Sequence, residues 1–265
     1  NAVDFGDLTL ARSSTSCVSN TSRGITGGGY TPTYFDTIDY FIPSSKGNAA
    51  DFGNLTLARY GTITSNNDTI GVFMGGDSPT DDNRMENITI ATTGNGTDFG
   101  NTTINIIQGG GQVNSSTRGL YMGGYSSPTA NNTIGYITFG SLGDATDFGD
   151  LSVTRFDEGG VCSSTRGVAA GGSTSPANSN VIDYVTIAST GNAQDFGDLT
   201  VARQGIANGA SNKIRGVISG GTTGSYTDVM DYITIASTGN ATDYGDLTSA
   251  VGYAGGNANG HGGLS

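Results

Sequence analysis

Short stretches of apolar and polar residues, separated by Gly, Ser, Asn, Thr and Asp, follow one another along the whole chain. In the clearest copy they predict four strands, at residues 205–210, 215–219, 229–236 and 243–248. The third stretch is rich in Ile, Val, Tyr and Thr, which suit a pleated, half-buried surface. No stretch keeps an apolar stripe at helical spacing, and 45 of the 265 residues are Gly. We therefore predict an all-β chain with almost no helix.

This four-strand pattern repeats about every 48 residues. The tripeptide Asp-Phe-Gly, once Asp-Tyr-Gly, begins at Asp4, Asp51, Asp98, Asp147, Asp195 and Asp243. Four short strands per unit favour a radial β-propeller, because the rungs of a linear β-solenoid need a much shorter repeat.

We predict a single propeller domain over residues 1–265 with five four-stranded blades. A lone fourth strand at 4–12 and a lone first strand at about 249–259 would overlap, so that the ends meet and no sheet edge stays open. A six-bladed ring, with its last blade incomplete or supplied by another chain, is the alternative. The chain begins at Asn1, within a unit and without a methionine, which leads us to expect a processed or excised product.

Each unit also carries a fixed order of landmark residues: an Arg, a strand ending in Gly-Gly, a variable loop, a strand with a Tyr, and then an aromatic residue and a Leu. In the fifth copy these are Arg203, Gly220-Gly221, Tyr232, Tyr244 and Leu247. This order resembles the kelch repeat, which implies kelch-like propeller blades. The chain departs from that pattern because it has no Trp. A Phe or Tyr stands near the usual Trp position of each unit.

The exact amino-acid sequence of the repeat shows a second resemblance. The stretch Ser-Thr-Gly-Asn-Ala-Gln-Asp-Phe-Gly-Asp-Leu-Thr at 189–200 is similar to repeat arrays of virion and tail-fibre proteins of marine bacteriophages. The likeness covers nearly the whole chain, although Asn54 and Asn101 replace the last Asp in two copies. It implies a location on a virion surface or outside the cell, and other virion or assembly proteins as partners.

Composition narrows the classes of partner. The formal net charge is −12, and all but two of the 23 acidic residues are Asp, whose short carboxylate suits turns. So acidic a surface repels phosphate backbones, and we expect no nucleic-acid binding. No run of 18 apolar residues occurs, so we expect no membrane insertion. Cys17 and Cys162 lie in equivalent segments of non-adjacent units, which predicts two free thiols.

The strongest candidates for a metal site are paired acids with the spacing Asp-x-x-Asp. A turn that offers two carboxylates and nearby carbonyls could supply part of a calcium shell, so calcium is the one cofactor that the sequence suggests. The competing and favoured interpretation gives these acids a structural role in the turn, because no complete calcium loop is present. The candidates are Asp4, Asp7, Asp147, Asp150, Asp195, Asp198, Asp243 and Asp246.

Two sets of repeated arginines allow two interpretations. A ring of guanidinium groups could recognise an acidic glycan. A group that recurs in every unit is more simply explained as a clasp between blades, from Arg to a turn Asp or a carbonyl, and we favour this. One set follows the fourth strand and the other precedes the second: Arg12, Arg59, Arg155 and Arg203, and Arg23, Arg118, Arg166 and Arg215.

Catalysis has little support in the sequence. The single histidine, His261, lies in a glycine-rich stretch, and no acid differs from its copies in other units. We name no catalytic residue and expect no enzyme activity.

The loops that follow Gly-Gly vary most between units, and variation on a fixed frame favours binding. Exposed Tyr beside Asn and Asp offers a sugar an apolar face and hydrogen-bonding partners. The candidate ligand-binding residues are Tyr30, Tyr34, Asp36, Asp82, Arg84, Tyr125, Asn132, Tyr226 and Asp228.

The sequence therefore predicts a non-enzymatic virion or surface module that binds host glycan or protein through these loops. A passive decoration or spacer protein of an assembly, and a secreted lectin, are the alternatives.

Overall fold

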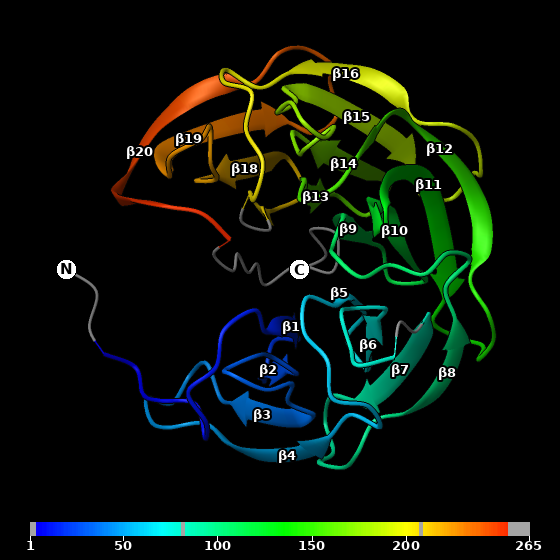
Figure 1. Cartoon of the computed structure of the whole chain (residues 1–265), viewed down its shortest axis with the longest axis vertical. Coiled ribbons are helices and arrows are strands. Elements are labelled where there is room, and N and C mark those ends of the chain that lie inside the picture. The colour runs from blue at the N-terminus through cyan, green and yellow to red at the C-terminus, as the bar shows by residue number, and fades with distance from the viewer. Residues whose placement is uncertain (1–3, 81–82, 207–208, 254–265) are drawn as a thin grey trace.

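The computed structural model describes residues 4–80, 83–206 and 209–253 and shows a β-propeller of five four-stranded antiparallel blades (Figure 1). Blade 1 holds β1 (Ser16–Ser19), β2 (Gly24–Gly27), β3 (Thr37–Phe41) and β4 (Ala50–Asn54). Blade 2 holds β5 (Ile63–Asn66), β6 (Ile70–Met74), β7 (Arg84–Thr89) and β8 (Thr97–Asn101). Blade 3 holds β9 (Gly111–Asn114), β10 (Arg118–Ser126), β11 (Thr129–Thr138) and β12 (Thr146–Arg155). Blade 4 holds β13 (Gly159–Cys162), β14 (Arg166–Ala170), β15 (Val181–Thr186) and β16 (Gln194–Asp198). Blade 5 holds β17 (Ala210–Ser211), β18 (Arg215–Ser219), β19 (Thr227–Thr234) and β20 (Thr242–Val251).

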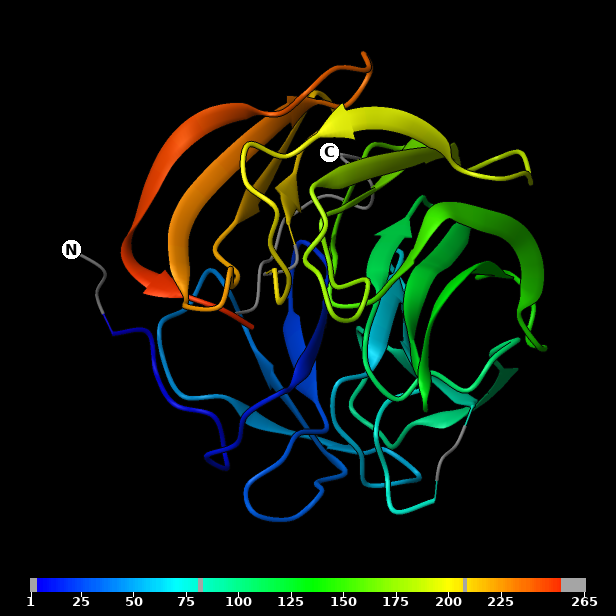
Figure 2. The ribbon, with the colours of Figure 1, turned by 45° about the horizontal axis from the view of Figure 1, so that its top comes forward.

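The strands of each blade pair in sequence order, so each sheet is a simple meander. The first strands of successive blades contact one another around the centre, and the fourth strands form the rim (Figures 1 and 2). The described residues contain no helix, as predicted, and therefore no helix that could cross a membrane. Cys17 and Cys162 are free thiols, also as predicted.

The predicted strand positions in the fifth unit are confirmed for three strands and wrong for the first. We expected a first strand at 205–210, whereas β17 covers only Ala210–Ser211, and residues 207–208 lie outside the described part of the chain. Gly205 instead belongs to the connection between blades, with a φ of 58° that a strand residue does not adopt. The predicted strand at 4–12 is also wrong, because this segment joins no sheet. Of the predicted strand at 249–259, residues 249–251 belong to β20, and residues 254–259 lie outside the described part of the chain.

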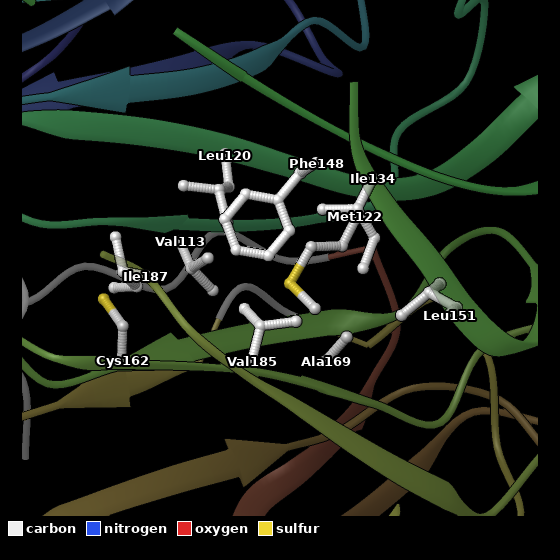
Figure 3. Close-up of a cluster of buried hydrophobic side chains, with 10 residues drawn as sticks. All are labelled: Val113, Leu120, Met122, Ile134, Phe148, Leu151, Cys162, Ala169, Val185 and Ile187. Atoms are coloured by element: carbon white, nitrogen blue, oxygen red, sulfur yellow. The ribbon is translucent and has the colours of Figure 1, made fainter. Parts of the chain in front are cut away.

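Four apolar cores lie between successive blades and hold the arc together. In the core between blades 3 and 4, Phe148, Met122 and Leu120 point toward Val185 and Ala169 of the neighbouring sheet (Figure 3). Equivalent cores join blades 1 and 2, blades 2 and 3, and blades 4 and 5. The described residues form no such core between blades 5 and 1, and Figure 1 shows an opening there. The predicted meeting of the two ends is therefore absent from the described structure.

Backbone contacts at the rim repeat at every blade junction. The tip of the turn between the third and fourth strands of one blade donates a hydrogen bond to the preceding fourth strand, as from Gly191 N to Phe148 O at 2.7 Å. The same bond joins Gly94 N to Phe52 O at 2.8 Å. Residues 4–12 make this contact with blade 1, where Gly47 N donates to Phe5 O at 2.9 Å. This segment therefore occupies the place of a fourth strand from a preceding blade.

Candidate functional site

The arginines that follow the fourth strands are buried clasps between blades. The Arg203 Nη1 atom lies 2.8 Å from Asp231 Oδ2, and both side chains are fully buried. Equivalent pairs join Arg12 to Asp39, Arg59 to Glu86 and Arg155 to Asp183. The clasp interpretation is confirmed, with one correction. The acid stands in the third strand of the next blade, not in a turn.

One junction replaces the ion pair by apolar packing. At the junction of blades 2 and 3, Ile106 occupies the arginine position and Gly135 the acid position. Tyr121 fills the space beside Gly135, and Ile106 and Tyr121 belong to one core. The arginine and the acid are therefore absent together, as expected if a buried charge is kept only with its partner.

Three arginines of the second set join blades through carbonyl groups. Arg118 Nη1 donates to Ile187 O at 2.9 Å, and Arg166 Nη1 donates to Ile235 O at 2.9 Å. Arg23 Nη1 makes the same contact with Ile90 O at 3.2 Å. Each guanidinium also lies over a Tyr ring of its own blade, as Arg166 does over Tyr184 at 4.3 Å. These arginines are therefore engaged in the fold.

The predicted ligand-binding residues are spread over the blades, and the structure brings Tyr30 and Tyr34 together. These two and Asp36 lie in the loop between β2 and β3. Asp82 lies outside the described residues, and Arg84 begins β7. Tyr125 and Asn132 belong to β10 and β11. Tyr226 directly precedes β19, and Asp228 lies within it.

Tyr30 and Tyr34 form an aromatic cluster with Tyr60, which the sequence analysis missed. The ring centroids of Tyr30 and Tyr34 are 5.6 Å apart, and each lies 5.3 or 5.6 Å from that of Tyr60. Tyr60 comes directly after the clasp residue Arg59, where other units carry Ser13, Phe156 or Gln204. Tyr60 is the one residue at this position of the units that joins an aromatic ring to a hydroxyl group, which was a signal in the sequence. We call Tyr30, Tyr34, Tyr60 and Asp77 the tyrosine cluster.

Backbone pairing fixes the tyrosine cluster at the junction of blades 1 and 2. Tyr60 N donates to Asp77 O at 3.0 Å, and Asp77 N donates back to Tyr60 O at 2.9 Å. Tyr30 forms bridges to Ser13 and to Tyr34. The rings are therefore attached to hydrogen-bonded backbone. Because these loops are already ordered, binding of a ligand costs less conformational entropy.

A carboxylate lies within the tyrosine cluster. Tyr60 Oη donates to Asp77 Oδ2 at 2.6 Å, and Tyr34 Oη lies 3.4 Å from Asp77 Oδ1. The hydrogen bond to Asp77 is the main cause that raises the pKa of Tyr60 to about 12. Tyr30 is 39% exposed, so one ring faces solvent. The cluster thus combines an exposed aromatic face with hydroxyl and carboxylate groups, the set that binds sugars.

Arg84 lies in a separate hollow. Its Nη1 atom donates to Thr56 Oγ1 at 2.9 Å. Thr56, Arg84, Asp98 and Asn101 line a hollow of about 460 Å³ that shares no residue with the tyrosine cluster. The predicted ligand residues therefore do not form one site.

Six of the eight paired acids of the Asp-x-x-Asp repeats lie in fourth strands, and two of the eight accept a hydrogen bond from the backbone two residues further on. The six are Asp147 and Asp150 in β12, Asp195 and Asp198 in β16, and Asp243 and Asp246 in β20. Asp243 Oδ1 accepts a hydrogen bond from Gly245 N at 2.8 Å, and Asp4 Oδ1 accepts one from Gly6 N at 3.1 Å. In the described ranges, the structure gathers no group of three or more His, Cys, Asp or Glu side chains that could hold a metal ion. His261 lies outside the described residues.

Two further acids lie near the centre of the arc with raised pKa values. Burial raises the pKa of Glu158 to about 8, although the Arg155 guanidinium opposes this. Burial also raises the pKa of Asp157 to about 6, against hydrogen bonds from Gln108 and Tyr253. Both carboxyl groups hold their protons more tightly in the folded chain than in the unfolded chain.

We expect the free energy of unfolding to fall as the pH rises through the titration of Glu158. Its pKa is about 8 in the folded chain against 4.5 as the ordinary value, so its contribution is fully present below about pH 4.5. This contribution is lost progressively as the pH rises toward about 8. Urea unfolding between pH 4.5 and 9 measures it, with Glu158→Gln as the comparison. A variant with the same pH dependence as the native chain would contradict the assignment to Glu158.

No protein-family model matches the chain, and no curated protein matches it.

Proposed function

We propose that this chain is a non-enzymatic binding module of a virion or another extracellular surface, and that it binds host glycans through the tyrosine cluster. The observation that carries the proposal is the mutual contact of three tyrosine rings, two of which bond Asp77, on loops that vary between units. The propeller supplies the rigid frame, and the loop residues supply recognition.

The chemistry of the tyrosine cluster favours a neutral or amino sugar. A pyranose ring presents C–H groups on one face, which stack on an exposed aromatic ring such as Tyr30. Its hydroxyl groups donate to a carboxylate such as Asp77. An acidic glycan is disfavoured, because the formal net charge of −12 repels it. The same charge supports the proposal that nucleic acid is not a partner.

The proposal also covers the location of the module and its partner proteins. The order of strands and landmark residues supports a kelch-like repeat. The exact amino-acid sequence of the repeat supports a virion or tail-fibre protein. We therefore place its partners among virion or assembly proteins on one side and host surface glycan on the other.

We expect Tyr30→Ala to weaken glycan binding about tenfold or more, because the loss of an aromatic contact removes about 1–2 kcal/mol. The native chain is first applied to an array of cell-surface glycans, and the strongest ligand is then titrated by calorimetry. Tyr60→Phe keeps the ring but removes the hydrogen bond to Asp77, so it separates stacking from polar recognition.

The matched control is Leu142→Ala, which removes a side chain that is 69% exposed in the turn between β11 and β12. Its affinity should equal that of the native chain. If the native chain binds no glycan, or if Tyr30→Ala and Leu142→Ala bind equally, the proposed function is wrong.

A further inference from the structure

The face of blade 5 that borders the opening is built like the buried faces of the other blades. Val217 and Met230 in blade 5 match Val168 and Ile182 in blade 4. The blade 4 residues are fully buried, whereas Val217 and Met230 are partly exposed. Tyr244 is 50% exposed, although its counterpart Phe196 is 3% exposed. We call Val217, Met230, Tyr244, Leu247 and Val251 the terminal face.

The terminal face also lacks two contacts that other junctions make. A Cβ added at Gly149 or Gly197 would meet the turn of the following blade, whereas one added at Gly245 meets nothing within 4 Å. Arg166 donates to a carbonyl of the next blade. Its counterpart Arg215 is exposed and lies over Tyr232 of its own blade.

We propose that the terminal face docks a sixth four-stranded unit of this same repeat, entered by the chain that follows Tyr253. The described backbone after β20 already has the conformation of the connections that lead from one blade into the next. Tyr253 N donates to Gly205 O at 2.8 Å, as Asp157 N does to Gly109 O at 2.9 Å. Tyr253 has a φ of 56°, close to the 58° of both Asp157 and Gly205. In units 4 and 5 this residue precedes the first strand of the next blade.

The charge pattern defines which unit fits. Where a clasp arginine stands at or after the end of a fourth strand, the next blade presents a buried acid, as in the pair of Arg203 and Asp231. Where Ile106 stands at this position after β8, the next blade presents Gly135 beside Tyr121. β20 ends in Val251, so the sixth unit must carry no acid at this position of its third strand.

The same pattern excludes blade 1 as the partner. Blade 1 presents Asp39, whose side chain is fully buried and paired with Arg12. If β20 replaced residues 4–12 on blade 1, Val251 would stand in place of Arg12 and leave a buried carboxylate without its counter-ion. Closure into a five-bladed ring, and docking onto blade 1 of a second copy, are therefore disfavoured.

Grafted units test the proposal on the full chain. Residues 254–265 are replaced by a copy of 110–154, which carries Gly135, or by a copy of 158–202, which carries Asp183. Each graft is made with Val251 and with Val251→Arg. With Val251, the first graft should raise the unfolding midpoint by about 5 °C or more and slow amide exchange in β20, because it buries the terminal face. The second graft should raise the midpoint and slow the exchange less, because its Asp183 then has no arginine as a partner.

With Val251→Arg the order of the two grafts should reverse, because Asp183 then has a partner. Equal effects of the two grafts on both backgrounds would overturn the proposal. So would a stronger effect of the Asp183 graft with Val251.

A second test uses the chain without a graft. Leu247→Ser should leave the unfolding midpoint within about 1–2 °C of the native value, whereas Leu199→Ser at the matching buried position should lower it by about 5 °C or more. The mass in solution is measured for the native chain and both variants. An equal loss for Leu247→Ser, or a native dimer that Leu247→Ser dissociates, would show that something else covers the terminal face and would overturn the proposal.

Discussion

Arg203→Met is expected to lower the free energy of unfolding by about 3–5 kcal/mol, the cost of leaving one partner of a buried ion pair alone. Arg203 donates to Asp231 and also to the carbonyl groups of Gly220 and Ile218. Its removal therefore strands the Asp231 carboxylate and two acceptors between blades 4 and 5. Urea unfolding followed by circular dichroism measures the change.

Two further variants separate charge from packing. Arg215→Met removes a guanidinium that is exposed, and it should cost less than about 1 kcal/mol. Asp231→Leu added to Arg203→Met should recover much of the loss, because the junction with Ile106 and Gly135 is stable without charge. A loss below about 1 kcal/mol for Arg203→Met would contradict the buried clasp, since it would mean that water reaches Asp231.

Gly149→Ala is expected to destabilise the chain by about 2–4 kcal/mol, the combined cost of backbone strain and overpacking. Gly149 in β12 has a φ of 144°, and a Cβ there would lie 2.5 Å from the backbone of Gly191 in the next blade. The turn that carries Gly191 would have to move away, which breaks its hydrogen bond to Phe148 O. Thermal unfolding and exchange of the Gly191 amide report the change.

Gly245→Ala is the matched control. Gly245 has a φ of 114° at the equivalent position of β20, but no atom lies within 4 Å of an added Cβ. Its cost should therefore be limited to backbone strain, about 1–3 kcal/mol, and should be smaller than that of Gly149→Ala. Equal losses for the two variants would mean that the junction contributes nothing at Gly149.

The candidate binding site could be predicted only in part. Tyr30 and Tyr34 stand four residues apart in one loop, so local sequence was enough to suggest them. Tyr60 and Asp77 come from the connection after β4 and from the loop after β6, and they meet Tyr34 only because blades 1 and 2 pack side by side. The sequence contained a tyrosine at position 60, where other units carry Ser13, Phe156 or Gln204, but not its distance from the other rings.

The arginine clasps could also be predicted only in part from the sequence. Their repetition predicted a structural role for Arg59, Arg155 and Arg203. Their acidic partners stand 27 or 28 positions away in the third strand of the next blade, as Arg203 and Asp231 do. That contact depends on how two neighbouring blades are aligned with each other. The sequence of one unit does not contain this alignment.

The sequence by itself determined the repeat, the four-stranded unit, the absence of helix and the positions at which glycine permits close packing. These depend on local preferences, which are the same in every copy of a unit. Only the tertiary structure decided how the units end. Residues 4–12 and 243–251 share six of their nine residues, yet the first segment is clasped to Asp39 of blade 1 and the second borders an opening. Burial of a strand face depends on its neighbour across the junction, so similar segments take different environments when their neighbours differ.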